Sequence, residues 1–185
     1  MKNQTSQYSD QELCILLSDQ GSSADAAFAE IYSRYSSRLH AYCVKIMNDY
    51  DEASDIFQET FIRFVQAARN KSEMTNVPAF LLRIARNLCL NAKRDKKQTT
   101  EPMDYMLVSE DRNYDKKQLL DLIDDALSKL SEEYKEAFVL REYDGFSYQE
   151  IADITGLSLS NVKIRVVRAK NQIREILQPY IKELS

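Results

Sequence analysis

The stretch FSYQEIADITGLSLSNVKIRVVRAK, residues Phe146–Lys170, contains the start and stop signals of two consecutive helices. Ser147 is followed by Glu150 at the spacing of a capping box, which predicts the start of a short helix. Gly156 suits the left-handed residue that ends such a helix, because glycine has no Cβ to clash there. Ser158 or Ser160 can then cap a second helix. The stretch therefore predicts a short helix, a tight turn and a longer helix.

The predicted second helix has one apolar face and one polar, basic face. Its apolar residues recur at spacings of four, three and four positions, and they are Val162, Val166, Ala169 and Ile173. The opposite face carries Ser160, Asn161, Lys163, Ile164, Arg165, Val167 and Arg168. No Asp or Glu occurs from Thr155 to Arg174, although the chain has a formal net charge of -4. This pattern is typical of a DNA-binding helix-turn-helix, and an ordinary amphipathic helical hairpin is the alternative.

The whole sequence has the composition of a helical protein. Of its 185 residues 44% are hydrophobic, and it has only three glycines and three prolines. Apolar residues at helical spacing predict helices over residues 10–18, 24–47, 52–68 and 78–96. Residues 97–115 are acidic, have no sustained helical period and contain Pro102. We therefore expect an all-α fold with an N-terminal domain over residues 1–96, a flexible linker over 97–115, and a C-terminal domain over 116–185 that contains the helix-turn-helix.

Several classes of protein are not indicated by the sequence. No apolar run approaches the roughly 18–20 residues of a membrane span, and the N-terminus is too polar for a secretory signal, so we expect a cytoplasmic protein without membrane insertion. Cys14, Cys43 and Cys89 are far apart on apolar stripes, which indicates reduced core thiols. With His40 as the only histidine and no glycine-rich phosphate loop, we expect no metal site and no cofactor. No catalytic set of side chains indicates an enzyme.

The N-terminal domain has a second basic helix, preceded by an acidic one. One face of the basic helix would carry Arg83, Arg86, Asn87, Leu90, Lys93, Arg94 and Lys97, and the other Leu81, Ile84, Ala85, Leu88 and Ala92. The preceding helix would bury Ala53, Ile56, Phe57, Thr60, Phe61 and Phe64 and display Asp51, Glu52, Asp55, Gln58 and Glu59. Two basic helices indicate contact with nucleic acid at two places. Phosphates would repel the acidic face, which indicates a protein partner there, and a merely solvated face is the alternative.

Three segments in this order resemble those of a bacterial RNA polymerase sigma factor of the extracytoplasmic-function (ECF) group. DEASDIFQETFIRF, from Asp51, is similar to the segment that binds core polymerase. FLLRIARNLCLNAKRDKK, from Phe80, is similar to the segment that opens and reads the minus 10 promoter element. LREYDGFSYQEIADITGLSLSNVKIRVVRAKNQIRE, from Leu140, is similar to the segment that reads the minus 35 element. The resemblance extends over about residues 10–178.

The resemblance implies a dissociable, non-enzymatic sigma subunit that directs promoter-specific transcription initiation. Its implied partners are promoter DNA, core RNA polymerase, through the clamp helices of the largest subunit and the flap of the second-largest, and the anti-sigma factor that members of the group often have. The implied polymerase-binding residues are Asp55, Gln58 and Glu59. The implied minus 10 residues are Arg83, Arg86, Asn87, Lys93 and Arg94, with the loop Asn70–Val77 around a flipped base. The implied minus 35 residues are Ser160, Asn161, Lys163, Ile164, Arg165 and Arg168.

Two positions depart from the pattern of this family. Ser131 stands where many relatives have proline, and Ile164 stands where they usually carry a small polar residue. An exposed isoleucine would suit a thymine methyl group, so no known minus 35 sequence can be transferred to this chain. Two other hypotheses stay open at this point. One is a stand-alone helix-turn-helix regulator, which would bind specific DNA tightly by itself, and the other is a helical adaptor or an enzyme with an unrecognised site.

Overall fold

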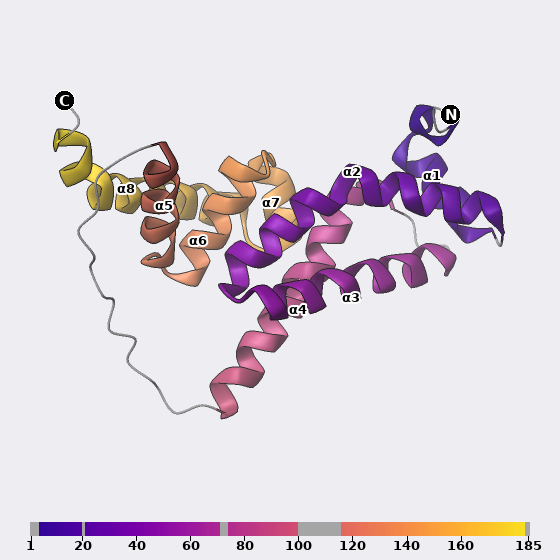
Figure 1. The fold of residues 1–185 in the computed structure, drawn as a ribbon, viewed down its shortest axis with the longest axis horizontal. Helices are drawn as coiled ribbons and strands as arrows, with labels where there is room; N and C mark the ends of the chain where they lie inside the picture. The colour runs from indigo at the N-terminus through magenta and orange to yellow at the C-terminus, as the bar shows by residue number, and fades with distance from the viewer. Residues whose placement is uncertain (1–3, 20, 71–73, 100–115, 184–185) are drawn as a thin grey trace. The chain divides into compact units, whose positions relative to one another are not determined.

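Helices make up all the regular structure in the residues that the computed structural model describes, which are 4–19, 21–70, 74–99 and 116–183. In chain order they are the 3-10 helix η1 (Gln4–Gln7), α1 (Asp10–Ser18), α2 (Ser22–Met47), α3 (Tyr50–Arg69), α4 (Val77–Thr99), α5 (Lys116–Ser128), α6 (Glu132–Phe138), the π-helical turn η2 (Val139–Tyr143), α7 (Tyr148–Thr155) and α8 (Leu159–Glu183) (Figure 1). The predicted all-α fold class is confirmed.

The chain divides into two compact units. One consists of Met1–Asp95 with Asp153–Thr155, and the other of Lys96–Ala152 with Gly156–Ser185. Helix α4 continues past residue 96, the predicted end of the N-terminal domain, as far as Thr99. The remainder of the predicted linker, residues 100–115, lies outside the described residues. The predicted limits of the linker and of the two domains therefore stay predictions.

Polar side chains mark where helices of the first unit begin. At α1, Ser9 N–H donates to Glu12 Oε2 at 2.7 Å, and Glu12 N–H donates to Ser9 Oγ at 3.3 Å. At α4, Ala79 N–H donates to Asn76 Oδ1 at 3.0 Å. Pro78 occupies the first turn of α4 as predicted, because a helix needs no N–H donor there. These caps satisfy backbone groups that the helices themselves leave unpaired.

A charged network joins α1 to α2. Arg34 Nη1 lies 2.8 Å from Asp10 Oδ1, and Arg34 Nε lies 2.9 Å from Glu30 Oε1. Arg34 Nη2 also donates to the Tyr8 carbonyl at 2.9 Å, and the Tyr35 hydroxyl donates to Asp10 Oδ2. Burial, and then the hydrogen bond to Asp10, raises the pKa of the Tyr35 hydroxyl above its ordinary value. The phenol therefore stays a hydrogen-bond donor that holds α1 against α2.

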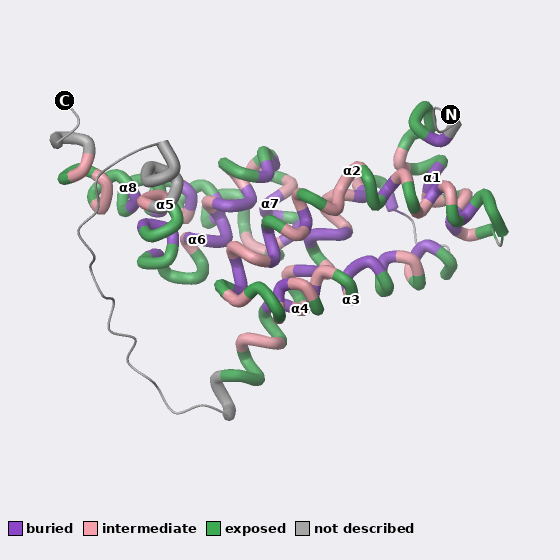
Figure 2. The backbone as a smooth tube through the Cα atoms, in the orientation of Figure 1, coloured by how far each residue is buried: buried purple, intermediate pink, exposed green. Residues whose placement is uncertain are grey.

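Buried residues line the facing sides of α1, α2, α3 and α4 in the first unit (Figure 2). They include Leu13, Leu17, Ala27, Ile31, Leu39, Cys43, Phe61, Phe64, Leu81, Ala85 and Cys89. Cys43 and Cys89 are buried, Cys14 is half-buried, and all three are free cysteines, as predicted from their apolar positions. The cysteines thus contribute to packing as small apolar side chains.

In the second unit, α5, α8 and the residues after α5 share a core of Ala126, Leu127, Leu130, Ala169 and Ile173, and Tyr134 and Phe138 of α6 pack against it. Helix α6 is followed directly by the π-helical turn η2. There Asp144 N–H donates to the Val139 carbonyl at 3.0 Å, and Phe146 N–H donates to the Leu140 carbonyl at 3.1 Å. The wider turn accompanies the burial of Phe146, which is only 3% exposed.

Candidate nucleic-acid and polymerase interfaces

The turn between α7 and α8 has the geometry that its sequence predicts. Ser147 N–H donates to Glu150 Oε2 at 2.9 Å, and Glu150 N–H donates to Ser147 Oγ at 3.2 Å, which completes the capping box. Gly156 ends α7 with φ 73°, a left-handed conformation. Ser158 Oγ then accepts a hydrogen bond from Asn161 N–H at 3.3 Å at the start of α8. Of the two predicted capping serines, Ser158 is therefore the one that caps α8.

The apolar stripe of α8 is fully buried, which determines the face that the helix presents to solvent. Val162, Val166 and Ala169 are 0% exposed, and Ile173 is 8% exposed. Ala169 and Ile173 pack in the shared core against Ala126 and Leu127 of α5 and against Leu130, which follows α5. Because this side of α8 is anchored, residues on the opposite side face outward.

The outward side of α8 has an uncharged strip with cations on both sides. The strip consists of four exposed residues at spacings of four, three and four positions, which are Ser160, Ile164, Val167 and Asn171. On one side lie Lys163, Lys170 and Arg174; on the other lies Arg168, with the partly exposed Arg165 further round toward the buried face. A helix in the major groove meets base edges along its centre and phosphates on both sides, so this arrangement fits duplex DNA.

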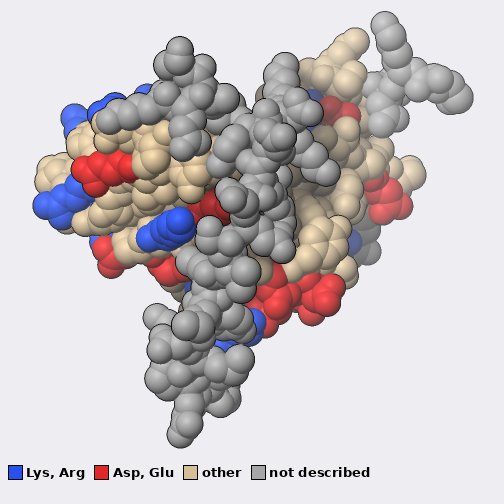
Figure 3. Space-filling model, turned by 60° about the vertical axis from the view of Figure 1, so that its left-hand side comes forward, with Lys and Arg blue, Asp and Glu red and all other residues tan. Residues whose placement is uncertain are grey.

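Three of these cations have partners on α6 and η2 that the sequence did not reveal. Arg165 Nη2 lies 2.9 Å from Glu133 Oε2, Lys170 Nζ lies 2.8 Å from Glu142 Oε1, and Arg168 Nη1 donates to the Tyr134 hydroxyl at 3.0 Å. Acidic and basic side chains are interspersed on the face drawn in Figure 3. The basic face of α8 is therefore partly neutralised by its own unit, although α8 itself carries no acidic residue before Glu175.

The basic face of α4 is exposed, and its buried face differs from the predicted one. Arg83, Asn87 and Arg94 are exposed, whereas Arg86 and Lys93 are partly buried. The guanidinium carbon of Arg83 lies 5.3 Å from the centroid of the Phe80 ring. Of the five predicted core positions only Leu81 and Ala85 are buried, while Ile84, Leu88 and Ala92 are half-buried. Leu82 and Cys89 are buried at 3% and 1% exposure, so the core meets α4 on a slightly rotated face.

The predicted polymerase-binding residues lie together on α3. Asp55 and Gln58 are exposed, and Glu59 is half-exposed. Glu59 Oε1 lies 2.6 Å from Arg63 Nε, one turn further along the helix. Phe57 lies between them in sequence and is half-buried, although the sequence predicts that it is buried. The three predicted residues therefore share an accessible side of α3, and Phe57 faces the packed side.

Aromatic side chains from α2 and α3 form a cluster where these two helices pack against each other. The Phe57 centroid lies 6.0 Å from that of Tyr32, 5.3 Å from that of His40 and 5.3 Å from that of Phe61. Tyr32 is 42% exposed, so part of the cluster is accessible. Sequence reasoning missed the cluster because it is assembled from two helices whose aromatic residues lie far apart along the chain.

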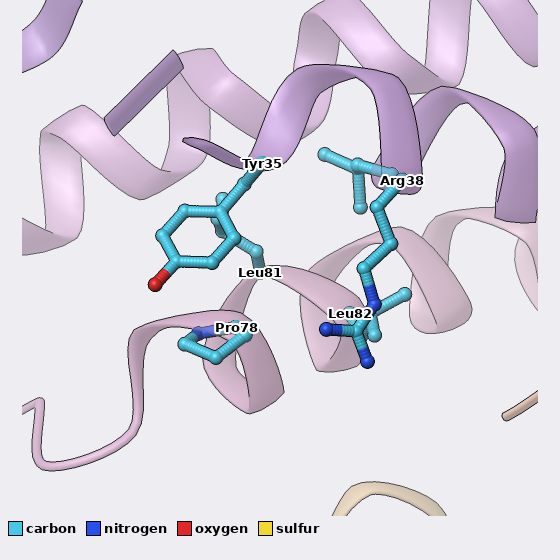
Figure 4. Close-up of a pocket in the computed structure, with 6 residues that line it drawn as sticks. Tyr35, Arg38, Pro78, Leu81 and Leu82 are labelled. Atoms are coloured by element: carbon cyan, nitrogen blue, oxygen red, sulfur yellow. The ribbon is translucent and has the colours of Figure 1, made fainter. Parts of the chain in front are cut away.

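A small hollow lies between α2 and α4. Figure 4 shows Tyr35 and Arg38 reaching from α2 toward Pro78, Leu81 and Leu82 of α4. The hollow has a volume of about 200 Å³ that includes open solvent. Its lining combines apolar side chains with the guanidinium group of Arg38, and it adjoins the beginning of α4.

The loop Asn70–Val77, which the resemblance implies around a flipped base, is described except for residues 71–73.

The described residues offer neither a metal site nor a membrane-spanning helix. Over the part of the chain that the structure describes, no group of three or more His, Cys, Asp or Glu side chains could hold a metal ion. Among the same residues, no helix combines the length and the apolar character needed to cross a membrane.

Comparisons with known proteins agree with the order of these surfaces along the chain. Residues 31–99 match the family model for Sigma-70 region 2, and residues 120–173 match the model for Sigma-70, region 4. The ECF RNA polymerase sigma factor EcfG of Rhodopseudomonas palustris is 30% identical over 142 residues, which are 75% of this chain and 78% of that protein. The chain belongs to the ECF family of RNA polymerase sigma factors.

Two further relatives agree with this assignment. The ECF RNA polymerase sigma factor SigE of Mycolicibacterium smegmatis is 30% identical over 162 residues, which are 83% of this chain and 63% of that longer protein. The sigma factor RpoE of Bartonella quintana, solved in complex with the anti-sigma factor NepR, has 26% sequence identity and a TM-score of 0.67. That likeness covers 82% of this chain and 96% of the RpoE chain.

The sigma factor is a subunit that directs promoter-specific transcription, with core RNA polymerase and promoter DNA as its partners. The segment that matches region 2 contains the acidic face of α3 and the basic face of α4. The segment that matches region 4 contains the helix-turn-helix and the outward side of α8 as far as Ile173. A stand-alone helix-turn-helix regulator is not favoured, because such a protein would not account for the region 2 match.

Proposed function

We propose that the outward side of α8 reads the minus 35 element as a duplex. The observation that carries this assignment is the uncharged strip with cations on both sides, on a helix whose other side is anchored in the core. The proposed contacts are made by Ser160, Asn161, Lys163, Ile164, Arg165 and Arg168. Cations on both sides would neutralise phosphates and hold the strip against the base edges.

The basic face of α4 is proposed to capture the melted minus 10 strand. Its contacts would come from Arg83, Arg86, Asn87, Lys93 and Arg94. Exposed Arg83 beside the Phe80 ring supports this role, because guanidinium groups and aromatic rings can both stack on unpaired bases. A single strand bound on this face would offset the free energy of opening the duplex.

The acidic face of α3 is proposed to bind core polymerase at the clamp helices of the largest subunit. Asp55, Gln58 and Glu59, which share one side of α3, would make these contacts. The second unit would bind the flap of the second-largest subunit. In this arrangement the face that phosphates would repel meets a protein, and the two basic faces meet DNA.

Further expectations concern the protein as a whole. The proposed domains are residues 1–96 and 116–185, joined by a linker over residues 97–115. A cytoplasmic location and the lack of enzymatic activity follow from the work of a sigma subunit, which supplies specificity while the polymerase supplies catalysis. An anti-sigma factor is proposed as a regulatory partner, because RpoE of Bartonella quintana was solved with one.

The test compares two binding partners at the same salt concentration. Labelled protein is titrated with bacterial core RNA polymerase and, separately, with bare double-stranded DNA. Tight binding to polymerase with weak binding to bare DNA is expected, since an acidic chain gains little non-specific affinity for phosphates. Tight, sequence-selective binding to bare DNA without polymerase affinity would instead identify a free-standing regulator.

A further inference from the structure

Two branched apolar side chains occupy the centre of the proposed reading face. Ile164 is 47% exposed and Val167 is 53% exposed. They lie one turn apart on α8, between Ser160 and Asn171. A single exposed apolar residue is common on protein surfaces and calls for no explanation. Two neighbouring ones in the middle of a polar, basic face are a different case, because they form a continuous strip.

The surroundings of the strip determine what could cover it. Lys163 and Lys170 border one side, and Arg168 borders the other. Arg168 donates to the Tyr134 hydroxyl at 3.0 Å, and Arg165, further round the helix, lies 2.9 Å from Glu133. An apolar protein surface that covered the strip would also cover these cations, and it would offer them no anionic partner in place of water. A DNA duplex places phosphates over the cations and base edges over the strip.

Within the major groove, one base presents an apolar group. The C5 methyl of thymine projects into the groove, whereas the edges of the other bases present hydrogen-bond donors and acceptors that these side chains cannot pair. We propose that Ile164 and Val167 select thymine in the minus 35 element by packing against its methyl group. The inference rests on the assignment of α8 to that element and adds the base preference that the strip confers.

The expected size of the effect follows from the burial of one methyl group. Removing a buried methyl weakens binding by about fourfold. Deoxyuridine differs from thymidine only by this methyl and keeps the same base pairing. Replacing a contacted thymidine by deoxyuridine should therefore weaken wild-type binding by about fourfold. The same replacement should not change binding by a variant in which the contacting side chain is shortened to alanine.

The experiment uses the full chain assembled with core polymerase. Duplexes randomised over the minus 35 element are first selected by the wild-type holoenzyme. In a selected site, each thymidine is then replaced in turn by deoxyuridine, and binding is measured for the wild type, Ile164→Ala and Val167→Ala. Alanine favours the helix, and both positions are exposed, so folding should be retained. Leu159→Ala serves as a matched control, since Leu159 is 39% exposed on the same helix but outside the strip.

The outcomes separate this inference from the assignment on which it rests. Loss of the deoxyuridine effect in Ile164→Ala or Val167→Ala, with the effect intact in Leu159→Ala, is the expected result. If the wild type selects a minus 35 sequence but binds it equally well after every thymidine is replaced by deoxyuridine, the methyl contact is overturned and the α8 assignment stands. The absence of any base preference at minus 35 would overturn both, and an effect lost equally in Leu159→Ala would show that the strip has no special part in it.

Discussion

Replacing Glu133 by glutamine should strengthen promoter binding and make it more sensitive to salt. Glu133 Oε2 lies 2.9 Å from Arg165 Nη2, so a phosphate has to compete with this carboxylate for the guanidinium group. Glu133→Gln frees one cation, and each added phosphate contact changes the slope of log K against log salt by about -0.9. Lowering the salt concentration from about 0.2 M to about 0.05 M should then raise the affinity of the variant about 3.5-fold more than that of the wild type.

The assay is fluorescence anisotropy of a labelled promoter fragment with holoenzyme over a series of salt concentrations. The stability of the protein should change little, because Glu133 is 65% exposed and exposed ion pairs contribute only about 0–1 kcal/mol. Glu132→Gln is the matched control, since it removes the same charge from the neighbouring position. Equal slopes for the two variants would attribute the effect to net charge alone. Weaker binding by Glu133→Gln would refute competition and would mean that Glu133 positions Arg165 for DNA.

Three other perturbations test separate parts of the molecule. Gly156→Ala should destabilise the second unit by about 1–2 kcal/mol, and Gly156→Asn by less, because φ at this position is 73°. No steric clash adds to this cost, since a Cβ built at Gly156 meets no atom within 4 Å. The measurement is urea unfolding followed by circular dichroism, and wild-type stability in the alanine variant would contradict the prediction. Glu59→Lys should weaken binding to core polymerase about tenfold by reversing a charge on the acidic face, and unchanged affinity with unchanged helicity would remove that face from the interface. Burial, and then the charge of Asp10, raises the pKa of Cys14 from 9.0 to about 11, so iodoacetamide should alkylate it far more slowly at pH 8 in the native protein than in urea, and equal rates would contradict this. Because the pKa is raised in the folded state, the stability associated with the neutral thiol is present below pH 9 and is lost as the pH rises through about 11.

The sequence by itself determined the features that depend on near neighbours in the chain. The capping box at Ser147, the left-handed Gly156 and the buried stripe that begins at Val162 all follow from residues within a few positions of one another. The same holds for the separation of acidic residues on α3 from basic residues on α4. Helical periodicity places these side chains on one face whatever the helix packs against.

Only the tertiary structure decided which of those side chains meet partners from elsewhere in the chain. Arg168 donates to Tyr134, which lies 34 residues away, and Arg165 pairs with Glu133 across the same gap between α6 and α8. The aromatic cluster around Phe57 likewise needs α2 and α3 side by side, and the buried face of α4 is rotated from the one its periodicity predicts. Such contacts depend on how the helices pack, because side chains from different helices share no periodicity. The charge on the outward side of α8 is therefore decided by residues of α6 and η2 as well as by α8 itself.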